Sequence, residues 1–325
     1  MVIPIILLAV GFVLLIKGGD YFVDGATGIA RHFHLPEILI GATVVSIGTT
    51  LPEVMVSSGA ALRGSGSIAY GNAIGSIICN TALIAAITIA AKPGAAARKS
   101  LVLPVAFFFG ATAVYCFSAY VLGEFTRFIG IVLLFMFLAY MTVTVLQMKN
   151  TSALSVNETA ENTQNEGENR LFKDIILLVV GAVVIACGAD LLVDNAIIIA
   201  EKLGVSEKVI GLTIVALGTS LPEFVTAITS LIKGHGSLSL GNVIGANLFN
   251  LVLVSGAAVT INPFEVPISG YIGGINSSLV LDIPLMIAVM LILTVPALVK
   301  EKLYRFQGIL LLALYAAFCG LQVCL

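Results

Sequence analysis

The chain contains one stretch that decides its fold, Gly41-Ala-Thr-Val-Val-Ser-Ile-Gly-Thr-Thr-Leu-Pro-Glu53. The same pattern returns 170 residues later as Gly211-Leu-Thr-Ile-Val-Ala-Leu-Gly-Thr-Ser-Leu-Pro-Glu223, identical at eight of thirteen positions without a gap. A second block follows in the same register, since Gly71-Asn-Ala-Ile-Gly-Ser-Ile-Ile-Cys-Asn80 aligns with Gly241-Asn-Val-Ile-Gly-Ala-Asn-Leu-Phe-Asn250. The two halves of the chain are therefore copies of one unit.

The composition around these motifs is typical of a membrane protein. Of 325 residues, 59% are apolar and 10% are charged, against roughly 25% charged residues in soluble domains. About 20 helical residues cross the hydrocarbon core of a bilayer, and many apolar stretches reach that length. We predict ten spanning helices, near residues 2–30, 37–62, 67–91, 101–122, 125–148, 171–200, 209–232, 237–260, 277–299 and 303–324.

The number of spans in each copy sets how the copies are related. Each copy has five spans, an odd number, so the second copy must enter the membrane from the side opposite to the first. Inverted repeats are typical of secondary transporters, whose site lies near the midplane and is built by interrupted helices. We predict an all-α membrane protein of ten transmembrane helices in two inverted five-helix repeats, with broken helices 2, 3, 7 and 8 around a midplane ion site. The halves are residues 1–149 and 171–325, joined by a polar linker at 150–170.

The lysines and arginines in the loops predict the orientation. If the N-terminus lies outside, the cytoplasmic loops hold eleven of them and the outer loops four. An excess of positive charge marks the cytoplasmic side. We therefore expect a multi-pass protein of the cell (inner) membrane, with both termini outside and the linker 150–170 in the cytoplasm.

Each copy of the first motif places a proline inside an apolar span. Pro52 and Pro222 remove an amide donor and clash with the carbonyl four residues earlier, so spans 2 and 7 should break near their middle. Carbonyl groups freed at membrane depth must meet a ligand or line a cavity, and the candidates are those of Ser46 and Ala216. Four hydroxyls lie beside them, those of Thr49, Thr50, Thr219 and Ser220.

One residue after each proline comes an acid, Glu53 or Glu223, about halfway through its span. An acid there costs on the order of 3 kcal/mol and marks an ion pathway by default. Carboxylates, hydroxyls and carbonyls are the ligands that calcium prefers, and no His or Cys that would favour a softer metal accompanies the acids. The pattern predicts a hard-cation site, with a hydrogen-bonded pair of protonated glutamates that only packs as the alternative.

Spans 3 and 8 add amide side chains. Ser76 and Asn80 lie one turn apart on one helix face, and Asn250 is the copy of Asn80. A single intramembrane asparagine most often joins two helices, but its duplication favours ligation. Asn72 and Asn242 each follow a glycine near a helix start, where capping and function are equally good interpretations.

Two pairs of aspartates lie toward the ends of spans 1 and 6, Asp20 with Asp24 and Asp190 with Asp194. We expect solvated or structural roles for them. Lys17 is close enough in sequence to pair with Asp20 or Asp24, which makes it a structural residue.

The sequence Gly-Thr-[Ser/Thr]-Leu-Pro-Glu in both halves, each followed by Gly-Asn-x-Ile-Gly, resembles the alpha-repeats of the cation/calcium exchanger superfamily and its sodium/calcium exchanger family. The resemblance implies ten helices, with calcium and sodium sites formed centrally by helices 2, 3, 7 and 8. It implies calcium ligands at Glu53, Glu223, Thr49 and Thr219. Sodium would share the glutamates and use the carbonyls of Ser46 and Ala216 and the side chains of Thr50, Ser220, Ser76, Asn80 and Asn250.

The sequence departs from the family pattern at four places, one of which is Thr50, where a threonine replaces serine and keeps the hydroxyl. The usual Gly-Ser-Asn is Gly75-Ser-Ile77 in the first half and Gly245-Ala-Asn247 in the second, which puts one peripheral sodium site in doubt. Asn250 stands where potassium-dependent relatives resemble one another in having Asp, so we expect no potassium requirement.

Charge balance connects this site to transport. Two glutamates a few ångström apart cannot both stay ionised without a cation or a proton. One calcium ion or two sodium ions supply the same charge, so competition for one carboxylate pair predicts sodium/calcium antiport by alternating access, with spans 1 and 6 sliding across the other eight. A proton/calcium antiporter is the nearest alternative, although such relatives resemble one another in an Asn-Ala-x-Glu core; a cation channel is the next.

Other functions lack support in the sequence. No HExxH, GxSxG or P-loop pattern occurs, which argues against an enzyme, and we expect no cofactor besides transported calcium and sodium. A net charge of −2 without a basic stripe argues against a nucleic-acid partner. The expected partners are these cations and the lipid bilayer, with no protein partner required. Three histidines, His32, His34 and His235, are expected in loops and solvated.

Overall fold

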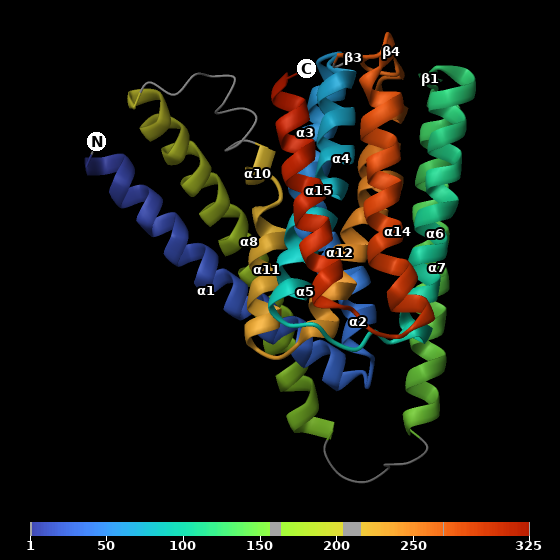
Figure 1. Ribbon diagram of the computed structural model, residues 1–325. Helices are drawn as coiled ribbons and strands as arrows, with labels where there is room; N and C mark the ends of the chain where they lie inside the picture. Colours follow the sequence, from blue (N-terminus) through green and yellow to red (C-terminus); the bar gives the residue numbers. More distant parts are fainter. Residues whose placement is uncertain (1, 157–163, 204–215, 269, 325) are drawn as a thin grey trace.

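The computed structural model describes residues 2–156, 164–203, 216–268 and 270–324. Within them, nine helices are long and apolar enough to cross a membrane. The seventh predicted span appears as two shorter helices, and its first residues, 209–215, lie outside the described part of the chain. The prediction of an all-α membrane protein is confirmed (Figure 1).

The first half supplies spans 1 to 5. In chain order its elements are α1 (Val2–His32), α2 (Glu37–Ile40), η1 (Gly41–Val45), α3 (Ser46–Leu62), α4 (Gly66–Cys79), η2 (Asn80–Ala85), α5 (Ala86–Ala91), α6 (Arg98–Cys116), η3 (Phe117–Leu122), β1 (Glu124–Phe125) and α7 (Arg127–Val156), where η marks a π-helical segment. Spans 2 and 3 are continuous helices in which a π-helical segment is embedded, and span 4 ends in such a segment, η3.

The second half repeats this plan. Its elements are α8 (Gln164–Lys202), α10 (Ala216–Gly218), α11 (Leu221–Ile232), α12 (Gly236–Phe249), η5 (Asn250–Ser255), α13 (Gly256–Ile261), β2 (Phe264–Glu265), β3 (Tyr271–Ile272), β4 (Ile275–Asn276), η6 (Ser278–Asp282), α14 (Ile283–Val299) and α15 (Arg305–Cys324). The segments η2 and η5 begin at Asn80 and Asn250, so the repeat preserves even this departure from α-helical geometry, which is often found at functional sites.

The predicted interruption of span 2 takes a different form. Pro52 lies inside α3 and the helix continues through it, whereas the departure from α-helical geometry is η1, which ends one residue before Ser46. Carbonyls that the wider π turn releases find partners within the protein. The Ser46 hydroxyl donates to the Gly41 carbonyl at 2.7 Å, and the Tyr140 hydroxyl donates to the Ala42 carbonyl at 2.9 Å.

Span 7 is interrupted as predicted. Thr219 and Ser220 form a turn between α10 and α11, and Pro222 occupies the first turn of α11. Proline is well tolerated there because its missing amide would have no intrahelical partner. The two copies of one motif therefore adopt different backbone conformations.

The helices that carry the motifs form the centre of the molecule. In spans 3 and 8, 78% of the most apolar window is buried, compared with 22% in spans 1 and 6. Helix α12 contacts η1, α3 and α11, and α3 contacts η5. The two halves approach closely here, since a Cβ on Gly245 would lie 2.6 Å from the Ala42 Cα atom.

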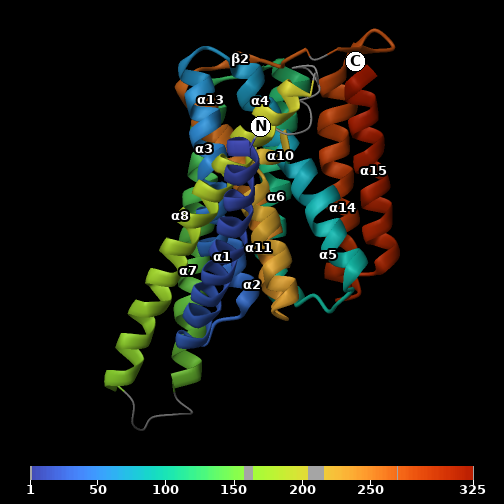
Figure 2. The same cartoon turned by 90° about the vertical axis from the view of Figure 1, so that its left-hand side faces the viewer.

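Helices α1 and α8 form a tilted pair beside this core (Figures 1 and 2). Glycines recur every seven residues on α1, at Gly11, Gly18 and Gly25, and each faces the α8 backbone. The opposing α8 glycines are Gly188, which meets Gly11, and Gly181, which meets Gly18. The pairing is antiparallel, and the small residues along this seam let the two backbones approach closely.

The ends of the chain define two sides. Helix α1 begins and α15 ends at one end of the molecule, whereas α7 ends and α8 begins at the other (Figure 1). Two short antiparallel ladders, β1 with β2 and β3 with β4, lie at the end with the termini. Helical residues extend into both ends of the predicted linker, whose residues 157–163 lie outside the described chain. Which side is cytoplasmic stays a prediction, as does the division into 1–149, 150–170 and 171–325.

Candidate cation-binding site

The two glutamates of the repeated motif are fully buried. Glu53 in α3 and Glu223 in α11 have 0% exposure, and their carboxylates are close enough to interact electrostatically. No hydrogen bond from a described residue reaches any of the four oxygens. A buried carboxylate without a partner loses its hydration and gains nothing in return, so this pair is a candidate for binding a cation.

Further polar atoms around the glutamates share this condition. The hydroxyls of Thr50 and Ser220 and the Oδ1 atoms of Asn80 and Asn250 are buried and accept or donate no hydrogen bond among the described residues. Each unsatisfied group costs about 1–3 kcal/mol. Their elements meet at the centre, since α3 contacts η5 and α11 contacts η2. The structure thus brings together oxygens from both halves, as a site for a hard cation requires.

Ser46 and Thr49 are also buried, but a residue of the other half engages their hydroxyls. The Ser46 hydroxyl donates to the backbone carbonyl of Asn242 at 3.0 Å, and the Thr49 hydroxyl donates to Asn242 Oδ1 at 3.2 Å. The Thr49 side chain also lies near that of Glu223. Asn242 therefore holds the end of η1 and the start of α3 against α12.

The asparagines Asn72 and Asn242 lie in the middle of α4 and α12, so helix capping is excluded for both. The Asn72 side chain donates to the Glu53 carbonyl at 3.3 Å and to the Ser57 hydroxyl at 2.8 Å. Both asparagines thus position segments that carry predicted ligands. The signal that could have identified them is their duplication within Gly-Asn-x-Ile-Gly.

The other predicted ligands are Ser76, Ala216 and Thr219. Ser76 is 3% exposed in α4, the helix that contacts α3, η5 and α10. Ala216 begins α10, and Thr219 follows it in the turn before α11. Thr219 and Thr49 line the same cavity.

This cavity, of about 510 Å³, lies between the α1–α8 pair and the core helices α3, α10 and α11. Asp190 and Asp194 of α8 line it together with Pro52 and Pro222. The two aspartates therefore face a space that reaches the motif residues. Both aspartates are exposed, as expected, and they place two carboxylates on the wall of the cavity.

The corresponding aspartates of α1 have another environment. The Lys233 ammonium lies 3.3 Å from the Asp20 carboxylate and 2.8 Å from that of Asp24. The assignment of Lys17 as their partner is wrong, because the α1–α11 packing brings a lysine 209 residues away into contact. The three residues form an ionic contact that joins α1 to the end of α11.

One histidine also differs from expectation. Nδ1 of His235 lies 2.7 Å from Oε1 of Glu37, and both side chains are only about a third exposed. His235 is therefore paired rather than simply solvated. His32 and His34 are exposed, as expected.

Replacing Lys233 by glutamine should loosen the end of α1. Partly exposed ion pairs contribute up to about 1 kcal/mol each, so we expect amide hydrogen exchange in residues 20–32 to rise up to about fivefold, with little change in thermal stability. Hydrogen exchange followed by mass spectrometry measures this. Lys202→Gln, at the exposed end of α8, is the control. Equal hydrogen-exchange rates in wild type and Lys233→Gln would show that these ion pairs do not stabilise the end of α1.

Comparisons with known proteins agree with this geometry. A family model described as sodium/calcium exchanger protein matches residues 3–146 and 173–324. The sodium/calcium exchanger MaX1 of Methanosarcina acetivorans is 31% identical over 345 residues, which cover 96% of this chain and 96% of that protein. The inner membrane protein YrbG of Escherichia coli is 34% identical over 275 residues, covering 82% of each.

Among solved structures, the sodium-calcium exchanger NCX_Mj soaked with 2.5 mM Na+ and 10 mM Sr2+ is similar over 97% of both chains, with a TM-score of 0.81 and 33% identity. The family match spans both halves of the sequence, and the similarity in structure is equally complete. Both confirm the resemblance that the repeated motifs indicate. The chain therefore belongs to the sodium/calcium exchanger family and is a membrane cation/calcium antiporter.

Proposed function

We propose that this protein exchanges sodium for calcium across the cell membrane, with Glu53 and Glu223 as shared ligands of both ions. The observation that carries the proposal is the pair of fully buried carboxylates to which no described residue donates a hydrogen bond. One calcium ion or two sodium ions neutralise the pair, so binding of one ion excludes the other. Antiport then needs no further chemistry and no resident cofactor.

The ligands fall into two groups. Calcium takes six to eight oxygens, which the glutamates with Thr49 and Thr219 begin to supply. Sodium uses the same glutamates with neutral oxygens farther along the helices, namely the carbonyls of Ser46 and Ala216 and the side chains of Thr50, Ser220, Ser76, Asn80 and Asn250. The unpartnered buried hydroxyls and amide oxygens support this second group, since a monovalent ion is well matched by neutral oxygens.

Sodium as the counter-ion also has support from relatives. MaX1 is named a sodium/calcium exchanger, and its similarity covers 96% of this chain. The similar NCX_Mj structure was soaked with Na+ and Sr2+, and strontium is the alkaline-earth ion next to calcium.

The proposed exchanger works by alternating access, and the two ends of the α1–α8 pair differ in a way that supports it. On the side of the termini, the cavity of about 510 Å³ reaches Thr49 and Thr219. At the other end, Lys233 connects α1 to α11. We assign this conformation to the outward-facing state, with both termini outside, and the reverse state to a slide of α1 and α8 along their glycine seam.

Calcium-45 uptake into proteoliposomes tests the coupling ion. Vesicles loaded with sodium should accumulate calcium, whereas vesicles loaded with potassium, or given only a pH gradient, should not. Uptake driven equally by a pH gradient without sodium would replace the proposal with proton/calcium antiport. Calcium flux without any counter-ion would mean a channel.

A further inference from the structure

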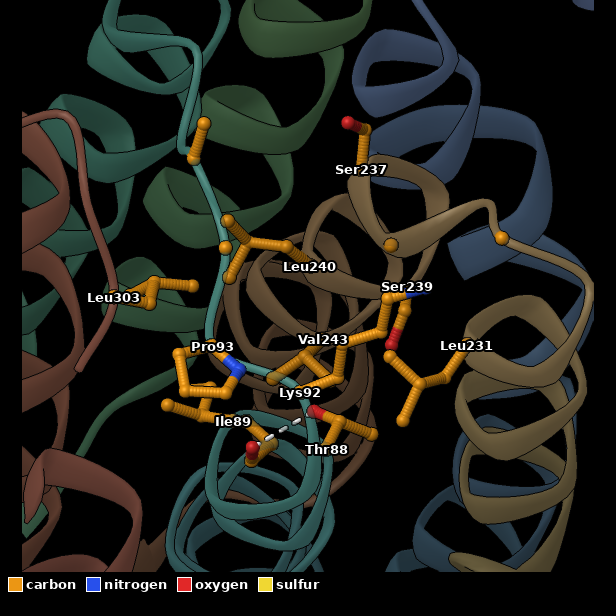
Figure 3. A pocket seen from close by; sticks show the side chains of 15 residues that line it. Thr88, Ile89, Lys92, Pro93, Leu231, Ser237, Ser239, Leu240, Val243 and Leu303 are labelled. Carbon is orange, nitrogen blue, oxygen red and sulfur yellow. Dashed lines mark hydrogen bonds between the residues drawn. The ribbon is translucent and has the colours of Figure 1, made fainter. Parts of the chain in front are cut away.

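We propose that a second cavity, at the end of the molecule opposite the termini, is a binding site for a phosphate group. It has a volume of about 260 Å³ and lies where α5 ends, α11 ends and α12 begins (Figure 3). The loop after α5 closes one side through Pro93 and Gly94, and Leu303 closes another. The cavity is separate from the glutamate site and shares no lining residue with the cavity beside Thr49.

The inverted repeat shows why this space exists. With the offset of 170, Gly94 corresponds to Phe264 and Gly236 to Gly66. At the end with the termini the ring of Phe264 covers the start of α4, since a Cβ on Gly66 would lie 2.6 Å from the Phe264 Cβ atom. At the opposite end, a Cβ on Gly94 or Gly236 would meet nothing within 4 Å. One half of the protein fills the space that the other half keeps open.

A buried hydroxyl points into the open space. Ser239 in α12 is 3% exposed, lines the cavity, and directs its oxygen toward the other lining side chains (Figure 3). It makes no side-chain hydrogen bond among the described residues, whereas the nearby Thr88 hydroxyl donates to the Ala85 carbonyl at 2.8 Å. In the other half the corresponding residue is Ala69. The Ser239 oxygen opens onto the cavity and is therefore available to a polar ligand.

The charge at the rim selects an anion. Helix α12 begins at Gly236, and the backbone amides of its first turn have no carbonyl partner within the helix. Two of them, those of Leu238 and Ser239, donate to the His235 carbonyl. Gly236 and Ser237, whose amides are not among these bonds, line the cavity together with Lys92. Helix N-termini and lysine are both well suited to phosphate.

No carboxylate lines the cavity in the described chain, and the nearby Glu37 is paired with His235. Arg305 adds positive charge close by, because its guanidinium donates to the Ala91 carbonyl at 3.3 Å. Apolar walls, including Leu231 and Leu240, leave room for more than the phosphate itself. The chemistry is therefore that of a phosphate group, supplied either by the headgroup of an anionic lipid or by free phosphate.

The repeat itself supplies the test variants. Gly94→Phe, Ser239→Ala and Lys92→Asn each install the residue of the other half, namely that of Phe264, Ala69 and Asn262. Protein purified in a non-ionic, phosphate-free detergent is titrated separately with inorganic phosphate, with phosphatidylglycerol and with phosphatidylcholine. Thermal unfolding and native mass spectrometry report binding, since a ligand that binds the folded state raises its unfolding temperature.

We expect saturable binding to wild type, loss of binding in Gly94→Phe, and about tenfold weaker binding in Ser239→Ala, the worth of one hydrogen bond to a charged group. Ser67→Ala, which alters the copy of Ser237 at the other end, should bind like wild type. Binding of phosphatidylglycerol without inorganic phosphate assigns the site to a lipid headgroup, and the reverse assigns it to a soluble anion. Binding to neither, or unchanged binding in both Gly94→Phe and Ser239→Ala, would overturn the proposal; Ser239→Ala decides if Gly94→Phe does not fold.

Discussion

Glu53→Gln and Glu223→Gln should each reduce sodium-dependent calcium transport by at least about a hundredfold. Removing one charge from a buried ionic cluster leaves the remaining charges uncompensated at a cost of about 3–5 kcal/mol, and 1.4 kcal/mol is a factor of ten in affinity. With one carboxylate left, a calcium ion would carry one unbalanced positive charge in a site with 0% exposure. Calcium-45 uptake and calcium binding by calorimetry both measure the loss.

The same variants should not weaken the fold. Glutamine has nearly the shape of glutamate and removes a buried charge that no described residue bonds, so the unfolding temperature in calcium-free buffer should be unchanged or higher. Glu124→Gln is the matched control, because Glu124 is an exposed acid in β1. If Glu53→Gln or Glu223→Gln transported calcium at a rate near that of wild type, the glutamates would not be shared ligands.

Gly18→Val should uncouple α1 from α8 and abolish most of the transport. A Cβ at this position would lie 2.8 Å from the Ile185 amide nitrogen and 3.1 Å from the Gly181 carbonyl oxygen. These are backbone atoms that cannot rotate away, so the helices must separate, and overpacking of this kind costs about 1–3 kcal/mol. The added side chain would also obstruct the proposed slide of α1 along α8.

Thermal unfolding and calcium-45 uptake together test this prediction. Gly320→Val in α15 is the control, since a Cβ on Gly320 would meet nothing within 4 Å. We expect a lower unfolding temperature and at least about tenfold slower uptake for Gly18→Val alone, in line with a cost of 1.4 kcal/mol or more. Uptake at the wild-type rate in Gly18→Val would mean that close contact at this point of the seam is not required for transport.

The sequence by itself determined the class of fold and the chemistry of the candidate site. Hydropathy is a local property, so the spans followed from it with small errors at their ends. The repeat was visible because eight of thirteen residues agree at one offset between Gly41 and Glu53. Because each copy has an odd number of spans, the second copy must be inverted in the membrane. Glu53 and Glu223 therefore approach the middle of the membrane from opposite sides.

Only the tertiary structure decided which side chains meet across the halves. Asn242 bonds Ser46 and Thr49 from nearly 200 residues away, and Lys233 replaces Lys17 as the partner of Asp24. Such contacts depend on how close the helices approach and on their crossing angles, which no short motif encodes. The different backbones at Pro52 and Pro222 and the space left by Gly94 opposite Phe264 have the same origin. Two copies of one sequence pattern pack against different neighbours, and that packing determines where each copy bends, binds or opens.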